Sequence, residues 1–66
     1  MSVAKITEIS SMSKKSFDHA IEEAIERANE TLKNVKSAWI KDQEVLIDNG
    51  KIVGYSVTMK ITFILK

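Results

Sequence analysis

The chain has 66 residues, with ten basic and nine acidic side chains, one histidine and no cysteine. Its net charge of +1 gives no electrostatic footprint for nucleic acid, and the absence of cysteine excludes disulfides and thiolate metal sites. No apolar run reaches the roughly 18 residues that a membrane span needs. The first residues, MSVAKITEIS, lack the apolar core of a signal peptide. We therefore expect a cytoplasmic protein that binds neither nucleic acid nor membrane.

The length also limits stability. We expect residues 1–66 to form a single domain. Below roughly 70–80 residues one core seldom stabilises a fold alone, and a disulfide, a metal or oligomerisation usually assists. Disulfides are excluded, and a single histidine argues against a zinc site within one chain. The sequence therefore favours stabilisation by oligomerisation.

The first half of the chain predicts a strand and then a helix. Residues 3–10, VAKITEIS, alternate in polarity as a short strand does. The next segment carries apolar residues at spacings of three and four, which predicts one amphipathic helix. This apolar stripe comprises Phe17, Ala20, Ile21, Ala24, Ile25, Ala28, Leu32 and Val35. Ser13 is the expected N-cap, which places Lys14 and Lys15 in the first helical turn.

The opposite face of the predicted helix is acidic. It carries Asp18, Glu22, Glu23, Glu26 and Glu30. We expect Arg27 to pair with Glu23, four residues earlier. Carboxylates four apart on a helix rarely converge on one cation without a further ligand, so we interpret this as a solvated face. His19 lies off the apolar stripe and is expected on the surface.

The second half predicts a hairpin. Residues 36–47 form its first strand, the Asn-Gly pair within Asp48–Lys51 its turn, and residues 52–65 its second strand. In the last strand the odd-numbered residues from 55 to 65 are apolar and are expected to pack on the helix, with Phe63 deep in the core. The even-numbered residues are mostly polar. The sequence therefore predicts an α+β fold of β-α-β-β order, with a three-stranded antiparallel sheet packed on one helix.

The only tryptophan, Trp39, lies in the first hairpin strand beside polar neighbours. These are Ser37, Lys41 and Gln43. Two interpretations of the tryptophan are open at this point. It fills a contact with another copy of the chain, or it stacks on a flat ligand.

Two long segments resemble the dodecin family. MSKKSFDHAIEEAIERANETLKNV is similar to the family's serine-capped turn and alanine-rich helix, and IDNGKIVGYSVTMKITFIL is similar to its hairpin. The match covers nearly the whole chain. The resemblance implies a homo-dodecamer, a hollow shell, which in many members binds a flavin (riboflavin, FMN or FAD) between subunits. It implies storage or quenching of the flavin rather than catalysis.

The flavin site implied by the resemblance is altered in this chain. In flavin-binding members a tryptophan after the helix stacks on the ring, and a glutamine after the hairpin tyrosine bonds the ring's edge. These positions are Ser37 and Ser56 here. An unpaired polar group of the ligand and a lost stacking contact each cost about 1–3 kcal/mol, which predicts flavin affinity lowered by about tenfold to a thousandfold. Trp39 lies two residues from Ser37, on the same face of a strand.

We therefore expect a non-catalytic shell protein for binding or storing a small ligand. The candidate ligand-binding residues are Ser37, Trp39, Asp42, Gln43 and Ser56. One alternative is a flavin-sequestering dodecin that uses Trp39 as a shifted stacking residue, with Gln43 and Ser56 as polar contacts. Another is a small protein-interaction module.

Metal binding and catalysis are less well supported. Some dodecins are proposed to handle calcium, and the acidic candidates here would be Asp42, Glu44 and Asp48, whose spacing matches no EF-hand loop. The metal specificity stays open. The chain has no cysteine nucleophile and no G-x-S-x-G motif, which argues against an enzyme.

Overall fold

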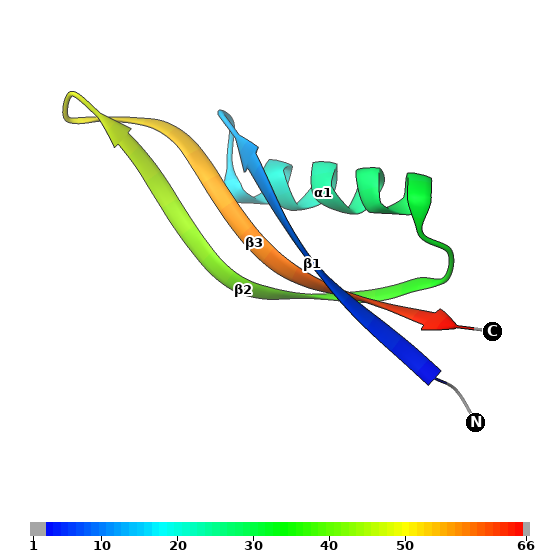
Figure 1. Cartoon of the computed structure of the whole chain (residues 1–66). Helices are drawn as coiled ribbons and strands as arrows, with labels where there is room; N and C mark the ends of the chain where they lie inside the picture. Colours follow the sequence, from blue (N-terminus) through cyan, green and yellow to red (C-terminus); the bar gives the residue numbers. More distant parts are fainter. Residues whose placement is uncertain (1–2, 66) are drawn as a thin grey trace.

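The computed structural model describes residues 3–65, which form one helix and three strands (Figure 1). The elements are β1 (Val3–Ser13), α1 (Phe17–Thr31), β2 (Val35–Asp48) and β3 (Lys51–Leu65). The sheet is antiparallel with the order β1-β3-β2. The predicted β-α-β-β fold is confirmed. β1 is three residues longer than expected, because its pairing with β3 continues to Ser13, opposite Tyr55.

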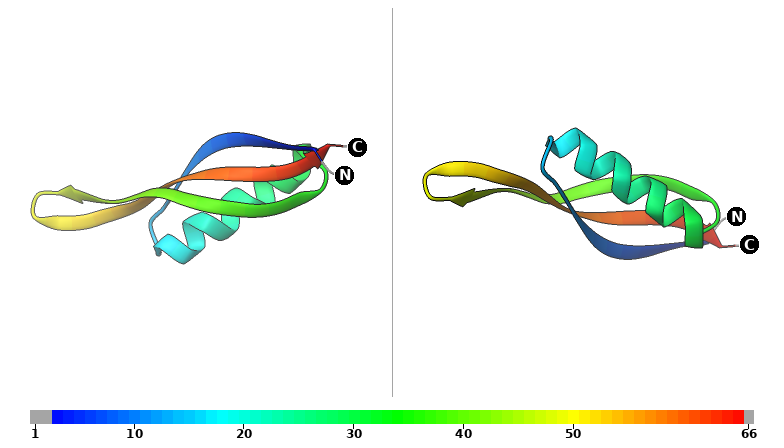
Figure 2. Two further views of the ribbon diagram at one scale, coloured as in Figure 1. Left: turned by 90° about the horizontal axis from the view of Figure 1, so that it is seen from below. Right: turned by 90° about the horizontal axis from the view of Figure 1, so that it is seen from above.

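The helix covers one face of the sheet and leaves the other face uncovered (Figure 2). Val57, Met59 and Ile61 of β3 are fully buried against Ala20, Ala24 and Ala28 of α1. Side chains alternate between the two faces of a strand, so the even-numbered residues of β3 point to the uncovered face. The predicted division of β3 into two faces is confirmed. Phe63 is only partly buried, since it lies toward the end of the sheet.

The pairing of β2 with β3 is interrupted by bulges. Lys36 and Lys41 in β2, and Val53 in β3, have no partner in the register. A bulge adds a residue to one strand, bends it and increases its twist. The pairing of β1 with β3 has no such interruption. The bulges therefore decide which residues of β2 face the helix.

The start of α1 differs from the expectation. Ser16, not Ser13, is the N-cap, and its hydroxyl accepts a hydrogen bond from the backbone N–H of His19 at 3.0 Å. Lys14 and Lys15 therefore precede the helix instead of lying in its first turn. Ser13 and Ser16 are both suitable N-caps by residue type. Ser13 is held in β1 by its pairing with Tyr55, and Ser16 is therefore the N-cap.

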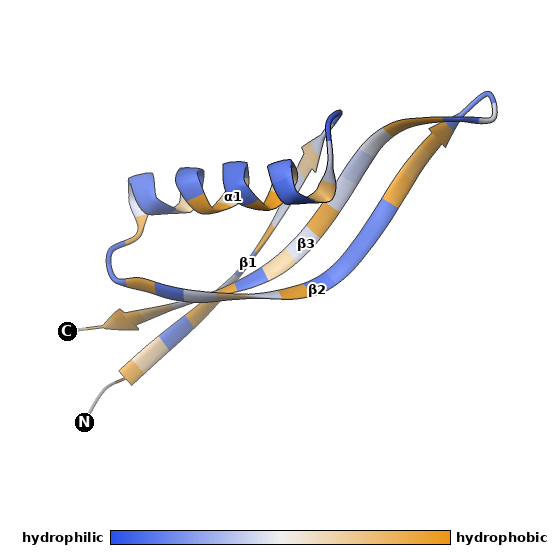
Figure 3. Ribbon diagram, turned by 180° about the vertical axis from the view of Figure 1, so that it is seen from behind, coloured by the Kyte–Doolittle hydropathy of each residue, from blue (hydrophilic) through white to orange (hydrophobic). Residues whose placement is uncertain are grey.

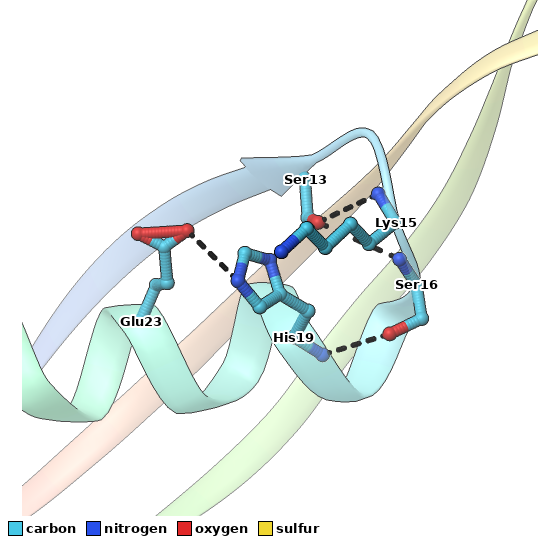
Figure 4. Close-up of polar contacts among 5 residues, drawn as sticks. All are labelled: Ser13, Lys15, Ser16, His19 and Glu23. Atoms are coloured by element: carbon cyan, nitrogen blue, oxygen red, sulfur yellow. Dashed lines mark hydrogen bonds and ion pairs between the residues drawn. The ribbon is translucent and has the colours of Figure 1, made fainter.

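Ser13 instead organises the turn between β1 and α1 (Figure 4). Its side chain is buried, with 5% of the residue exposed. The Ser13 hydroxyl accepts a hydrogen bond from the backbone N–H of Lys15 at 2.9 Å and lies 2.7 Å from His19 Nδ1. His19 Nε2 lies 3.4 Å from Glu23 Oε1. His19 is thus a partly buried link between strand and helix, and the expectation of a simple surface residue is wrong.

The helix is also shorter than expected. It ends at Thr31, and the N–H of the C-cap residue Leu32 donates to the carbonyl of Ala28 at 2.8 Å. Asn34 then adopts a φ of 62°, and Val35 begins β2 instead of ending the helical stripe. Asparagine tolerates this left-handed conformation better than most residues. The expected pair of Glu23 with Arg27 is replaced by a contact of 3.7 Å between Arg27 Nε and Glu30 Oε1.

The hairpin turn forms as predicted, with Asp48 paired to Lys51 across it. Asn49 has a φ of 51° and Gly50 a φ of 77°. Two central residues with positive φ match the twist of a tight hairpin, and an Asn-Gly pair adopts them readily. The hairpin extends well beyond the helix, which makes the molecule 51 Å long and only 19 and 13 Å across (Figure 1).

The core should be most sensitive at its centre. Met59→Ala should lower the free energy of unfolding by about 2–5 kcal/mol, because it leaves a cavity where the side chain is fully buried. Phe63→Ala should cost less than this, since Phe63 is only partly buried. The exposed control Glu26→Ala should stay within about 0.5 kcal/mol of wild type. Denaturant unfolding at one protein concentration measures all three, and a larger loss in Phe63→Ala would contradict the assignment.

The turn before the helix supplies a second prediction. Ser13→Ala should destabilise the protein more than Ser16→Ala, because Ser13 is buried and contacts both Lys15 and His19. Loss of a buried partner costs about 1–3 kcal/mol, whereas loss of an N-cap costs typically about 1 kcal/mol. Thermal unfolding of the two variants at equal concentration compares them. Equal losses would mean that Ser13 is only a second cap.

Candidate functional site

The uncovered face of the sheet holds most of the candidate residues. Ser37 lies opposite Thr62, Trp39 opposite Lys60, Asp42 opposite Thr58, and Glu44 opposite Ser56. Directly opposed residues of an antiparallel pair point to the same face. Ser37, Trp39, Asp42 and Ser56 therefore share the face that the helix does not cover.

Trp39 is the most prominent side chain of this face, with 68% of its surface exposed. The ammonium nitrogen of Lys60 lies 5.5 Å from the centre of its ring. A cation over an indole face is attracted by the ring's negative potential, with a strength of about 0.5–1 kcal/mol at an exposed site. Trp39 thus presents a large aromatic surface beside a positive charge.

Two further contacts tie the three strands together on this face. Lys41 Nζ reaches across the central strand to Glu8 of β1, 3.4 Å from each carboxylate oxygen. Ser10 Oγ lies 3.2 Å from Thr58 Oγ1. The bulge at Lys41 allows this side chain and that of Asp42 to share the face despite being sequence neighbours. Both contacts are exposed, so this part of the uncovered face is polar.

A hollow of about 320 Å³ lies over the middle of β2 and β3. It is lined by Asp42, Gln43, Glu44, Ser56 and Thr58. Gln43 lies opposite Val57, so the register assigns it to the helix-covered face, and it borders the hollow at the sheet edge formed by β2. The hollow combines carboxylates and hydroxyls, groups that can accept hydrogen bonds or approach a cation.

The candidate residues of the uncovered face are spread along it within one chain. Ser37 lies near the helix exit, Asp42 and Ser56 lie at the hollow, and Trp39 lies between them, one cross-strand pair from Asp42. Thr62, the partner of Ser37, is six residues along β3 from Ser56, which is about 20 Å at the usual rise per residue. The structure therefore does not bring Ser37 and Ser56 to one pocket within a chain.

A larger groove lies on the helix side, between α1 and the edge strand β1. Its volume is about 530 Å³, and it is lined by Thr7, Ile9, Ser10, Ser11, Glu23, Ala24, Arg27, Ala28, Thr31 and Leu32. None of the candidate residues belongs to it. The alanines of the apolar stripe are the sequence signal for this groove, because their small side chains leave room beside the helix. The depth of the groove depends on how β1 packs.

The acidic residues do not assemble into a metal site. Among residues 3–65, no three histidine or acidic side chains come close enough together to hold a metal ion. Asp48 is at the end of β2, next to the hairpin turn, away from Asp42 and Glu44. Within the same residues, no helix has the length and apolarity of a membrane span.

Comparison with known proteins agrees with this architecture. The dodecin family model matches residues 3–66. Calcium dodecin of Mycobacterium tuberculosis (strain ATCC 25618 / H37Rv) is 27% identical over 63 residues, covering 96% of this chain and 89% of its own.

Solved structures are similar over nearly their full length. Dodecin from Streptomyces davaonensis superposes with a TM-score of 0.92 at 31% identity, covering 98% of this chain and 96% of its own. The crystal structure of the Mycobacterium tuberculosis calcium dodecin, described as having a novel calcium-binding site, superposes with a TM-score of 0.83 at 28% identity. It covers 97% of this chain and 91% of its own.

The contact between Lys60 and Trp39 predicts a change in tryptophan fluorescence. Lys60→Ala should expose more of the indole ring, so collisional quenching by acrylamide should increase. Lys41→Ala is the matched control, because it removes a lysine of the same face that contacts Glu8 instead of the tryptophan. Trp39 is the only tryptophan, so its emission is unambiguous. An equal increase in both variants would show that Lys60 does not cover the ring.

Proposed function

Since the chain belongs to the dodecin family, whose members are small ligand-binding shell proteins, we propose that it assembles as a homo-dodecamer and binds or stores a small ligand. The ligand would lie on the uncovered face of the sheet, between subunits. The proposed role is non-catalytic. Residues 1–66 would act as one domain, and the shell rather than the single chain would be the functional unit.

The separation of the candidate residues carries this proposal. Ser37 lies about 20 Å from Ser56, as estimated from the strand rise, on a face that no other layer among residues 3–65 covers. A small ligand cannot touch both serines of one chain at once. A second copy placed over this face would bring one chain's Trp39 region near the other chain's hollow. This arrangement would complete a site that each chain holds only in part.

We propose that flavin binds weakly to this site. The resemblance assigns the stacking position to Ser37 and the hydrogen-bonding position to Ser56, and neither serine offers an aromatic face or a primary amide. The lost stacking and hydrogen bonds account for a reduction in affinity of about tenfold to a thousandfold. In this proposal Trp39 fills the contact between copies.

One observation favours a second candidate function. Trp39 is 68% exposed and already attracts the cation of Lys60, so its ring is accessible for stacking. It could therefore hold a flavin as a displaced platform, with Ser56 of another copy at the ring's edge. The name of the mycobacterial relative adds calcium as a further ligand to test, for which Asp42 and Glu44 are the adjacent carboxylates.

The first experiment measures assembly and binding together. Light scattering should give the mass of a dodecamer, and titration of riboflavin, FMN and FAD should quench flavin fluorescence only at high protein concentration. A monomer or dimer would contradict the shell and favour a small interaction module. Tight quenching by wild type would instead support Trp39 as the stacking residue. Calcium added in the same assay tests the carboxylates.

Restoring the family's residues provides the matching gain of function. Ser37→Trp with Ser56→Gln should bind FMN at least about tenfold more tightly than wild type, because it adds a stacking face and an amide. Adding Trp39→Glu removes a ring that could obstruct the new tryptophan and should bind most tightly. Each variant is first shown to assemble. Failure of an assembled triple variant to bind would mean that the pocket differs in more than these residues.

A further inference from the structure

The distal part of the hairpin, residues 45–54, pairs with no third strand among residues 3–65, and we call it the hairpin arm. β1 ends at Ser13, opposite Tyr55, so β3 pairs only with β2 throughout the arm. The helix does not reach it (Figures 1 and 2). A two-stranded hairpin in water is marginally stable unless another layer packs on it. The arm is therefore an element that requires a contact from outside its own chain.

The side chains of the arm point to the same requirement. Four large apolar residues are exposed on it, namely Val45, Ile47, Ile52 and Val53. Ile47 and Ile52 are paired across the arm and are 67% and 57% exposed. In Figure 3 the apolar bands of both strands lie next to the polar turn. A contiguous exposed patch of this kind marks an interaction surface.

The groove between α1 and β1 has the complementary character. Its apolar residues are Ile9, Ala24, Ala28 and Leu32, and its volume of about 530 Å³ accommodates several side chains. β1 is also an edge strand, whose open side needs cover. The chain's own arm cannot enter this groove, because the hairpin points away from the helix (Figure 1). The arm of a second copy can.

The charged residues of the two surfaces determine the orientation in which the arm would lie in the groove. Glu23 and Arg27 lie on the groove, one turn apart on α1. Asp48 and Lys51 are paired at the end of the arm, beside the turn. Each surface thus offers one anion and one cation at close spacing. The existing partners, Glu30 for Arg27 at 3.7 Å and His19 for Glu23 at 3.4 Å, are long contacts that compete weakly.

We propose that the hairpin arm of one copy docks in the α1–β1 groove of a second copy, with Asp48 against Arg27 and Lys51 against Glu23. The inference rests on the proposed homo-oligomeric assembly and specifies one of its interfaces. Arm and groove are different surfaces, so the contact is head-to-tail. Repeated head-to-tail contacts close into a ring when the rotation allows it, which suits a closed shell.

Charge reversal tests the proposed pairing. Arg27→Glu and Asp48→Arg should each raise the protein concentration needed for half-assembly by about tenfold or more, because like charges then face each other. The double variant should restore assembly to near the wild-type concentration. Lys14→Glu is the matched control, since it makes the same charge change on the exposed turn outside the groove. Circular dichroism confirms that each chain is folded. Failure of the double variant to recover would overturn the pairing.

Cysteine cross-linking provides a second readout, because the natural chain has no cysteine. Glu23→Cys with Lys51→Cys leaves the pair of Arg27 and Asp48 intact and should form disulfides between copies on oxidation. A ladder of linked chains is expected on a non-reducing gel. The control Glu26→Cys with Lys51→Cys should give none. An assembled protein that forms no ladder, or an equal ladder in the control, would overturn the interface.

The two proposals can fail separately. If wild type is monomeric in solution, both the shell and the docked arm are wrong. If wild type has the mass of a dodecamer but neither charge reversal nor cross-linking responds as expected, only the docked arm is wrong.

Discussion

The packing of three alanines of α1 against Val57, Met59 and Ile61 of β3 is the contact on which the rest of the structure depends. It is the only cluster of buried apolar residues among residues 3–65, and it consists of six side chains. The alanines have no bulk, so the helix lies close to the strand. A core this thin covers one face of the sheet, and within residues 3–65 no other layer packs on the opposite face, on the hairpin arm or on the groove beside β1. A core of this size is the kind that oligomerisation usually supports in small domains.

The uncovered face combines two properties that rarely occur together on a free surface. It carries an exposed tryptophan, and it also carries an ordered set of polar contacts, from Glu8 to Lys41 and from Ser10 to Thr58. A solvated face needs no tryptophan, and a simple apolar interface needs no ion pair spanning three strands. The combination fits a face that meets both another copy and a small ligand.

Much of the fold could be predicted from the sequence, because its patterns are local. The odd-numbered residues of β3 and the Asn49–Gly50 turn follow directly from strand alternation and turn geometry. The helix cap was not predictable in the same way. Ser13 and Ser16 are equally good caps by type, and the choice is made by the pairing of Ser13 with Tyr55, a contact 42 residues away in the sequence.

The site was only partly accessible for the same reason. Ser37 and Ser56 were both candidates for the ligand site, and the register places them about 20 Å apart within one chain. Gln43 was expected with them and is assigned to the other face. The groove between α1 and β1 was not anticipated, since the alanines of the stripe indicate room beside the helix but not which strand borders it. Each of these outcomes depends on the pairing of residues that are far apart in the sequence, and a short sequence segment does not reveal such pairing.

The unpaired Lys36 has an effect on how relatives of this chain should be compared. If β2 continued from Val35 without an extra residue, Ala38 would lie opposite Lys60, and Trp39 would lie opposite Met59, beneath the helix. The single bulge turns the indole to the outside. A residue's place in an alignment of β2 therefore does not determine its place on the surface, because a bulge moved by a few positions exchanges inside for outside. Within this strand, ligand preference can change through the position of an insertion while every side chain stays the same.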